Sequence, residues 1–272
     1  MATQEAPRQP LSIQIPHSSG GYFATNNQFL KKGPKGFSEF KILDNDGGMF
    51  TRMDFPGVNK ANLKFSIDED KKSVTFEGEA PKESPYEEEG RTYVWKTMPL
   101  QCDCCHISGV TADVKLGVLR VVLQKTDASD FDGGMGEGNA AALARLSPFG
   151  RAFVKMTMEG KISTVQLGSS GHSLEQHPQV TKGSGDAFEW KRTEDGGLFV
   201  RIDMPGVGKK KAEVVVEGGT VRFSGKAKKG EHDCGGRQYS GSFSLSPQRT
   251  DLEGKITHTL KNGVLRIVIP AA

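Results

Sequence analysis

The chain has 272 residues, which is enough for two domains of ordinary size that each bury a hydrophobic core. Its formal net charge of +3 argues against nucleic acid as the main partner, and no apolar run reaches membrane-spanning length. The first ten residues contain a glutamate, two prolines and no apolar core, so they do not predict a secretory signal. We therefore expect a cytoplasmic protein, with the nucleus as an alternative, that binds neither nucleic acid nor membranes.

In chain order, residues 1–36 predict a disordered N-terminal arm, and residues 37–125 predict a first domain. Within that domain apolar and polar residues alternate in short runs, as at Leu63, Phe65 and Ile67. This period of two is typical of β-strands with one buried face. Short strands separated by Gly, Pro, Asn and Asp predict an antiparallel β-sandwich.

Residues 126–186 differ from the first domain in composition. The stretch TDASDFDGGMGEGN is rich in Gly and Asp, and AAALARL after it predicts a short helix. An extended segment then leads to residue 186. This composition is typical of a flexible linker between two domains.

Residues 187–272 repeat the pattern of the first domain. DNDGGMFTRMDFPGV (44–58) aligns with TEDGGLFVRIDMPGV (193–207) without a gap, and KLGVLRVVL (115–123) aligns with KNGVLRIVI (261–269). Further strand-like blocks match in the same order between these two pairs. Repeats of this size indicate a duplicated domain. The fold class predicted is all-β, with two tandem immunoglobulin-like sandwiches joined by the linker.

The most similar string in the two copies predicts a turn. Proline pre-sets φ for the first central position of a type II turn, and glycine accepts the positive φ that follows. We expect each aspartate to hydrogen-bond the turn amides. The residues concerned are Asp54, Pro56 and Gly57 in the first copy and Asp203, Pro205 and Gly206 in the second.

Taken in order, these motifs resemble the α-crystallin domain of plant small heat shock proteins, the Hsp20 family. They are D-x-P-G-V before an alternating strand, then V-x-F-x-G, then A-x-x-x-x-G-V-L, which reads Ala112 to Leu119 in the first copy. In the second copy His258 takes the alanine position. The resemblance covers about residues 40–124 and 188–270. It implies an ATP-independent chaperone, or holdase, that dimerises through its sandwich and binds non-native proteins.

Three features depart from the family pattern. The chain ends at VIPAA after the last predicted strand, so we expect no C-terminal docking tail. The family places an arginine near the dimer contact, in the strand where YVWKTMP has only Lys96 and where the second copy has no basic residue. Two domains also share one chain. We therefore expect either self-association or pairing of the two domains within the chain, rather than a large tail-linked oligomer.

Two segments upstream of the repeats have the spacing of the family's Ile-x-Ile docking motif. They contain Ile13 and Ile15 in SIQIP, and Val165 and Leu167 in STVQLG. Such segments are able to add to a sheet edge, with paired side chains entering pockets. An ordinary strand or a disordered arm explains the same spacing. Candidate groove residues for the docking alternative are Val74, Phe76, Val110, Val221, Phe223 and Ile256.

The loops after the V-x-F-x-G strands differ in charge. The first contains Glu87, Glu88 and Glu89, and the second contains Lys226, Lys228 and Lys229. In plant relatives this loop reaches a partner domain, so opposite charges are able to favour pairing of copy one with copy two. The alternative is two solvated loops, because exposed charge pairs are weak.

Other motifs carry little chemistry. Cys102, Cys104, Cys105 and His106 lack the thiolate spacing of structural zinc sites, so we expect unpaired loop cysteines and no metal or cofactor. No nucleophile elbow, HExxH or P-loop occurs, which argues against an enzyme. The sequence favours a holdase for non-native client proteins. The alternative is a non-chaperone α-crystallin-domain adaptor within a specific intracellular complex.

Overall fold

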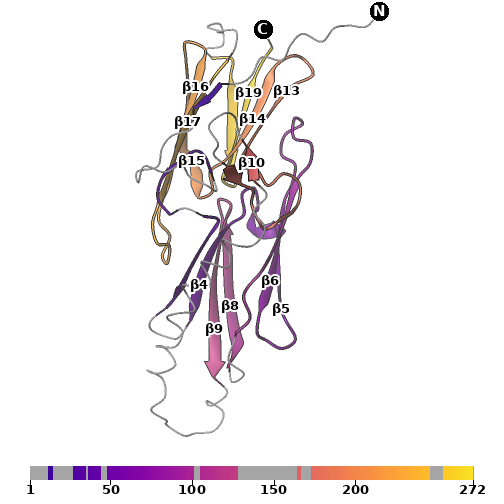
Figure 1. Cartoon of the computed structure of the whole chain (residues 1–272), viewed down its shortest axis with the longest axis vertical. Coiled ribbons are helices and arrows are strands. Elements are labelled where there is room, and N and C mark those ends of the chain that lie inside the picture. The colour runs from indigo at the N-terminus through magenta and orange to yellow at the C-terminus, as the bar shows by residue number, and fades with distance from the viewer. Residues whose placement is uncertain are drawn as a thin grey trace, which may run out of the picture.

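The computed structural model of the chain describes residues 12–14, 27–34, 36–43, 48–100, 105–127, 164–166, 173–245 and 254–271. Its strands form two sandwiches, one above the other in Figure 1. We call the violet-to-magenta sandwich domain 1 and the orange-to-yellow sandwich domain 2. The predicted all-β fold with two tandem sandwiches is confirmed. No helix in these ranges is long and apolar enough to cross a membrane.

Domain 1 contains seven strands of the first repeat in two sheets. The first sheet has the order β3, β4, β9 and β8, with the bounds Ser38–Ile42, Met49–Asp54, Val118–Asp127 and Cys105–Lys115. The second sheet contains β7, β6 and β5, with the bounds Arg91–Lys96, Val74–Ala80 and Leu63–Ile67. A 3-10 turn at Lys60–Asn62 precedes β5 and is capped by the side chain of Asn59.

Domain 2 repeats this topology. Its first sheet has the order β13, β14, β19 and β18, with the bounds Phe188–Arg192, Leu198–Asp203, Val264–Ile269 and Thr257–Lys261. Its second sheet contains β17, β16 and β15, with the bounds Arg237–Ser244, Thr220–Ala227 and Val207–Glu217. Each domain has its own hydrophobic core between its two sheets. The strand alternation explains these cores, since every second residue of β6, from Val74 to Ala80, is buried.

Two short strands cross from one domain to the other, and we call them the crossing strands. Strand β2 (Leu30–Lys32) precedes domain 1 in the chain but pairs with β17 of domain 2. Strand β12 (Val180–Lys182) precedes domain 2 but pairs with β7 of domain 1. In Figure 1 indigo, the colour of the first described residues of the chain, accordingly appears among the orange strands of domain 2. The two domains are therefore linked by a reciprocal exchange of edge strands.

The two crossing strands are packed unequally. Phe29 and Leu30 are buried in the core of domain 2, where the Phe29 ring contacts Phe223 at a centroid distance of 4.9 Å. The equivalent residues beside domain 1 are Gln179 and Val180, and Val180 is only partly buried against the core. Burial of apolar surface therefore holds β2 much more firmly than β12.

Among the described residues, three further short strands lie outside the two repeats. Strand β1 (Ser12–Gln14) pairs with β17, so it extends the same sheet edge that β2 occupies. Strands β10 (Thr164–Gln166) and β11 (Ser173–Glu175) pair with each other. The helix predicted over residues 140–146 lies outside the described residues.

Candidate functional site at the interface between the domains

The repeated Pro-Gly turns lie at the contact between the domains. In the first turn Val58 N donates to Phe55 O at 3.0 Å, and Gly57 has a φ of +93°. The Gly57 amide then donates to Asn262 O in the β18–β19 hairpin of domain 2 at 2.8 Å. The second turn does the same, since Gly206 N donates to Leu116 O at 2.8 Å. Each turn thus fixes the other domain's hairpin as well as its own strand.

A buried charge cluster surrounds the first turn. Arg52 donates to Glu39 Oε1 at 3.0 Å and to Asp54 Oδ1 at 2.9 Å, both within domain 1. Arg237 enters from β17 of domain 2 and donates to Asp54 Oδ2. We expected the Asp54 carboxylate to accept from the turn amides, but it accepts from these two arginines instead. Burial makes this arrangement necessary, because a buried guanidinium needs a compensating anion.

A loop of domain 2 completes this cluster. Asp233 accepts from Arg120 Nε at 2.8 Å and from Arg120 Nη2 at 2.6 Å, a bidentate pair across the interface. Beside it the His232 ring contacts Phe50 at 5.3 Å. We define the first cluster by its three arginines and three carboxylates, which are Arg52, Arg120, Arg237, Glu39, Asp54 and Asp233.

A second cluster of the same composition surrounds the second turn. Arg91 from β7 of domain 1 donates to Asp203 Oδ2 at 2.5 Å and to Glu189 Oε1 at 2.8 Å. Arg201 donates to Glu189 Oε1 at 3.0 Å. Burial is the largest single influence and opposes the charged form of Arg91, but Asp203, Tyr93 and Glu189 together outweigh it and raise the pKa of Arg91. The guanidinium therefore stays charged inside the interface.

A loop of domain 1 completes the second cluster. Glu87 is buried, accepts from Arg266 Nε at 2.6 Å and lies 3.5 Å from Arg201 Nε. The preceding residue, Tyr86, places its ring 5.8 Å from that of Phe199. We define the second cluster by Arg91, Arg201, Arg266, Glu87, Glu189 and Asp203. The two clusters are reciprocal in composition, because each contains four residues of one domain and two of the other.

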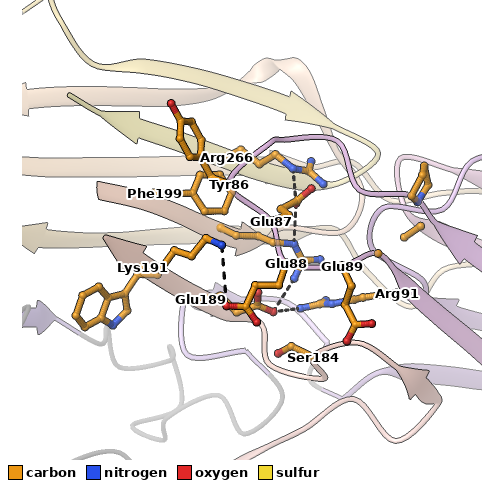
Figure 2. A pocket seen from close by; sticks show the side chains of 15 residues that line it. Tyr86, Glu87, Glu88, Glu89, Arg91, Ser184, Glu189, Lys191, Phe199 and Arg266 are labelled. Atoms are coloured by element: carbon orange, nitrogen blue, oxygen red, sulfur yellow. Dashed lines mark hydrogen bonds and ion pairs between the residues drawn. The ribbon is translucent and has the colours of Figure 1, made fainter. Parts of the chain in front are cut away.

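A cavity of about 320 Å³ lies beside the second cluster, as Figure 2 shows. The loop of residues 81–90 forms one wall, and β13 and β14 of domain 2 form the other. Tyr86, Trp190 and Phe199 contribute aromatic surface, while Lys191 lies 4.0 Å from Glu88 at the rim. Its cations and carboxylates largely pair with one another, so the charges stabilise the interface and point to no small-molecule chemistry.

Comparison with known proteins assigns the family. The family described as "Predicted plant small heat shock protein" matches residues 9–272. The chain belongs to this family. The resemblance drawn from the repeated motifs is thereby confirmed.

Individual relatives match over part of their length. "Putative 57 kDa heat shock protein" of Arabidopsis thaliana is 31% identical over 84% of this chain and 56% of that relative. "Heat shock 22 kDa protein, mitochondrial" of Pisum sativum is 34% identical over 36% of this chain and 48% of that relative. The chain thus spans about half the length of these relatives. Among solved structures, hspA from Xanthomonas axonopodis is 20% identical with a TM-score of 0.26, over 32% of this chain and 90% of that one.

The two charged loops each insert an acidic residue against the opposite domain, and within the described residues they do not form charge pairs with each other. Glu87 enters the second cluster, whereas Glu88 and Glu89 are exposed. Lys226, Lys228 and Lys229 are also exposed, and the acid that their loop inserts is Asp233. Sequence reasoning did not single out Asp233 or the six arginines. A usable signal was present, since both loops end in Gly-Arg, at Arg91 and Arg237. The contact between the domains therefore does contain arginines, upstream of the strand position at which the sequence lacks the family's arginine.

The structure places the predicted docking segments as follows. Strand β1 lies on the β17 edge with Ile13 opposite Phe243, and β10 pairs Val165 with Leu174. Ile15 and Leu167 lie outside the described residues. Among the candidate groove residues, four are buried in the two cores and two are partly buried against them: Val74, Phe76, Val221 and Phe223, then Val110 and Ile256. Docking by side-chain insertion remains a prediction.

The cysteines are not all unpaired. Cys105 is disulfide-bonded, which corrects our expectation at this position, and Cys234 is free and exposed. Within the described ranges, no group of three or more His, Cys, Asp or Glu side chains is arranged to hold a metal ion.

Glu87→Ala should destabilise the protein by about 3 kcal/mol, because it leaves the buried guanidinium of Arg266 without its carboxylate. Urea unfolding monitored by circular dichroism measures the loss. Glu88→Ala is the matched control, since the next side chain along is 87% exposed and should change stability by less than about 0.5 kcal/mol. Equal effects of the two variants would show that Glu87 does not hold the domains together.

Proposed function

We propose that this protein is an ATP-independent chaperone of the small heat shock type, which binds non-native client proteins and limits their aggregation. Family membership supports this role. The two domains form a pair of sandwiches within one chain. Twelve buried or partly buried charges stabilise the interface between them. The pair therefore leaves its outer sheet edges available to other proteins.

The observation that supports the proposal best is the apolar edge of domain 1. Strand β5 is the last strand of its sheet, and its side chains Phe65 and Ile67 are 47% and 42% exposed. An exposed apolar edge strand is a template for an extended segment of another chain. Unfolding proteins present such segments, and their capture lowers the concentration of aggregating species.

The corresponding edge of domain 2 is better protected. Strand β15 begins with a run of three lysines after Gly208, and Val214 and Val216 are only partly exposed. Charged residues on an edge strand, lysine above all, discourage pairing with other chains. We infer that clients bind mainly to domain 1. The Ile13 and Val165 segments are further candidates for edge docking, and strand β1 on the β17 edge supports that idea.

The test is thermal aggregation of a model client followed by light scattering, with the protein sized in the same buffer. We expect suppression at near-stoichiometric ratios. The double variant Phe65→Ser and Ile67→Ser should lose most of it, whereas Ser66→Lys on the opposite face of β5 should retain it. Absence of suppression by the unmodified protein would overturn the proposal.

The alternative function is a non-chaperone adaptor within a specific complex. The interface between the domains favours it, because the chain satisfies its own pairing surface and needs no second copy for that purpose. An adaptor would be a monomer without holdase activity and would retain one defined partner in a pull-down. For location, a mitochondrial protein is among the named relatives, and the cytoplasm, with the nucleus as an alternative, stays a prediction for this chain.

A further inference from the structure

The two crossing strands are anchored by equivalent side chains of different chemistry. Asn27 Nδ2 donates to the Asp203 carbonyl of domain 2 at 2.6 Å, and its Oδ1 accepts from Phe29 N at 3.0 Å. His177 occupies the same position before β12. Its Nε2 donates to the Asp54 carbonyl of domain 1 at 2.5 Å, and its Nδ1 accepts from Gln179 N at 3.3 Å. Each anchor thus uses one donor and one acceptor.

Only the neutral imidazole satisfies both hydrogen bonds at His177. Protonation would place a second N–H on Nδ1, directed at the amide that now donates to it. The ring is buried between Phe37 and Tyr93, at centroid distances of 4.5 and 5.2 Å, so water cannot replace the lost bond without movement. The amide of Asn27 does not titrate. Of the two anchors, therefore, only His177 changes its charge when the pH falls.

The charged and titratable groups around His177 come from three strands. They are Asp54 on β4, Arg91 and Tyr93 on β7, and Asp203 on β14. Both carboxylates are already committed to arginines of the two clusters. Neither is left free to compensate a new positive charge on the imidazole.

The segment that His177 anchors has few other restraints. Val94 N donates to Gln179 O at 2.9 Å and Thr181 Oγ1 to Thr92 O at 3.3 Å, and β12 adds the pairs Val180 to Tyr93 and Lys182 to Thr92. It lacks the buried aromatic residue that Phe29 supplies to the other crossing strand. Loss of the anchor should therefore free this segment before it affects the rest of the fold.

We propose that His177 is an acid-operated latch whose protonation releases β12 from the β7 edge of domain 1, while β2 stays on domain 2. The freed edge of β7 then offers backbone donors and acceptors for strand addition by an extended segment of a non-native protein. This second step rests on the proposed function. The latch itself does not.

The pH range follows from linkage. Burial lowers the pKa of His177 to about 4 from its ordinary 6.5, and Arg91 acts in the same direction, although Asp54 and Asp203 oppose it. Because the bound ring has the lower pKa, the latched state is fully stable above pH 6.5 and loses stability as the pH falls from 6.5 to 4. Between pH 7 and pH 5 the opening constant should rise about 20-fold.

Hydrogen exchange of the full chain at pH 7, 6 and 5, corrected for intrinsic exchange rates, tests the latch. Amides of β7 and β12 should lose about 20-fold in protection at pH 5, while those of β2 and β17 serve as the internal control and keep theirs. His177→Asn, which copies Asn27, should abolish the pH dependence, and Asn27→His should transfer it to β2 and β17. Should His177→Asn fail to fold, His177→Gln replaces it.

Two outcomes would overturn the latch: equal loss of protection at both crossing strands, or an unchanged pH response in His177→Asn. Client capture at pH 5 and pH 7 tests the second step separately. Release of β12 without greater capture at pH 5 would overturn strand addition on β7. Absence of capture at both pH values would count against the proposed function and leave the latch standing on the exchange data.

Discussion

Asp54→Asn is expected to lower the free energy of unfolding by about 3–5 kcal/mol, among the largest effects of any single substitution at the interface. Asp54 compensates Arg52 at 2.9 Å and also Arg237, which reaches it from the other domain. Without its charge the two buried guanidinium groups share Glu39, which lies 4.0 Å from Arg237. Urea unfolding at neutral pH measures the loss.

The pseudo-symmetric variant Asp203→Asn supplies the comparison. It should cost less, because Arg91 and Arg201 both keep Glu189, at 2.8 and 3.0 Å. Adding Arg237→Met to Asp54→Asn should restore part of the stability, since the uncompensated charge disappears together with its partner. If the double variant were less stable than Asp54→Asn alone, the cost would not come from the unpaired charge.

Gly117→Ala and Gly263→Ala should separate the domains. Both glycines have positive φ, at 68° and 71°, and a Cβ there would overlap a carbonyl oxygen of the other domain's hairpin. It would also meet Pro56 or Pro205 at 2.9 Å. Each sandwich keeps its own core, so we expect unfolding in two transitions and a larger radius of gyration by X-ray scattering.

Gly218→Ala is the matched control for this effect. Gly218 has a φ of +55°, but a Cβ there meets nothing within 4 Å. This variant should cost only the backbone strain, about 1–2 kcal/mol, and leave a single compact particle. If Gly117→Ala behaved in the same way, the two hairpins would not be pressed against each other.

Much of the fold could be predicted from local patterns. The alternation in β6 and β16 and the glycines of the turns are each fixed by residues a few positions apart. Strand faces and turn φ values depend on steric and solvation effects of that short range. The duplication strengthened these predictions, because each strand and turn motif occurs in both copies.

The interface was harder to predict, because the partners of each charge are far apart in the chain. Asp54 and Arg237 are separated by 183 positions, and Arg91 and Asp203 by 112. In the sequence these residues resemble ordinary surface charges. Only their burial against the other domain makes the pairing obligatory. That burial depends on how the two folded domains pack together, which no local sequence pattern reports.

The sequence by itself determined the family, the two sandwiches, and the turns that hold them, because these follow from short-range alternation and backbone sterics. Only the tertiary structure decided the exchange of β2 and β12 and the roles of Asn27 and His177. A strand of three residues has no distinctive pattern, and its position is set by the edge that accepts it.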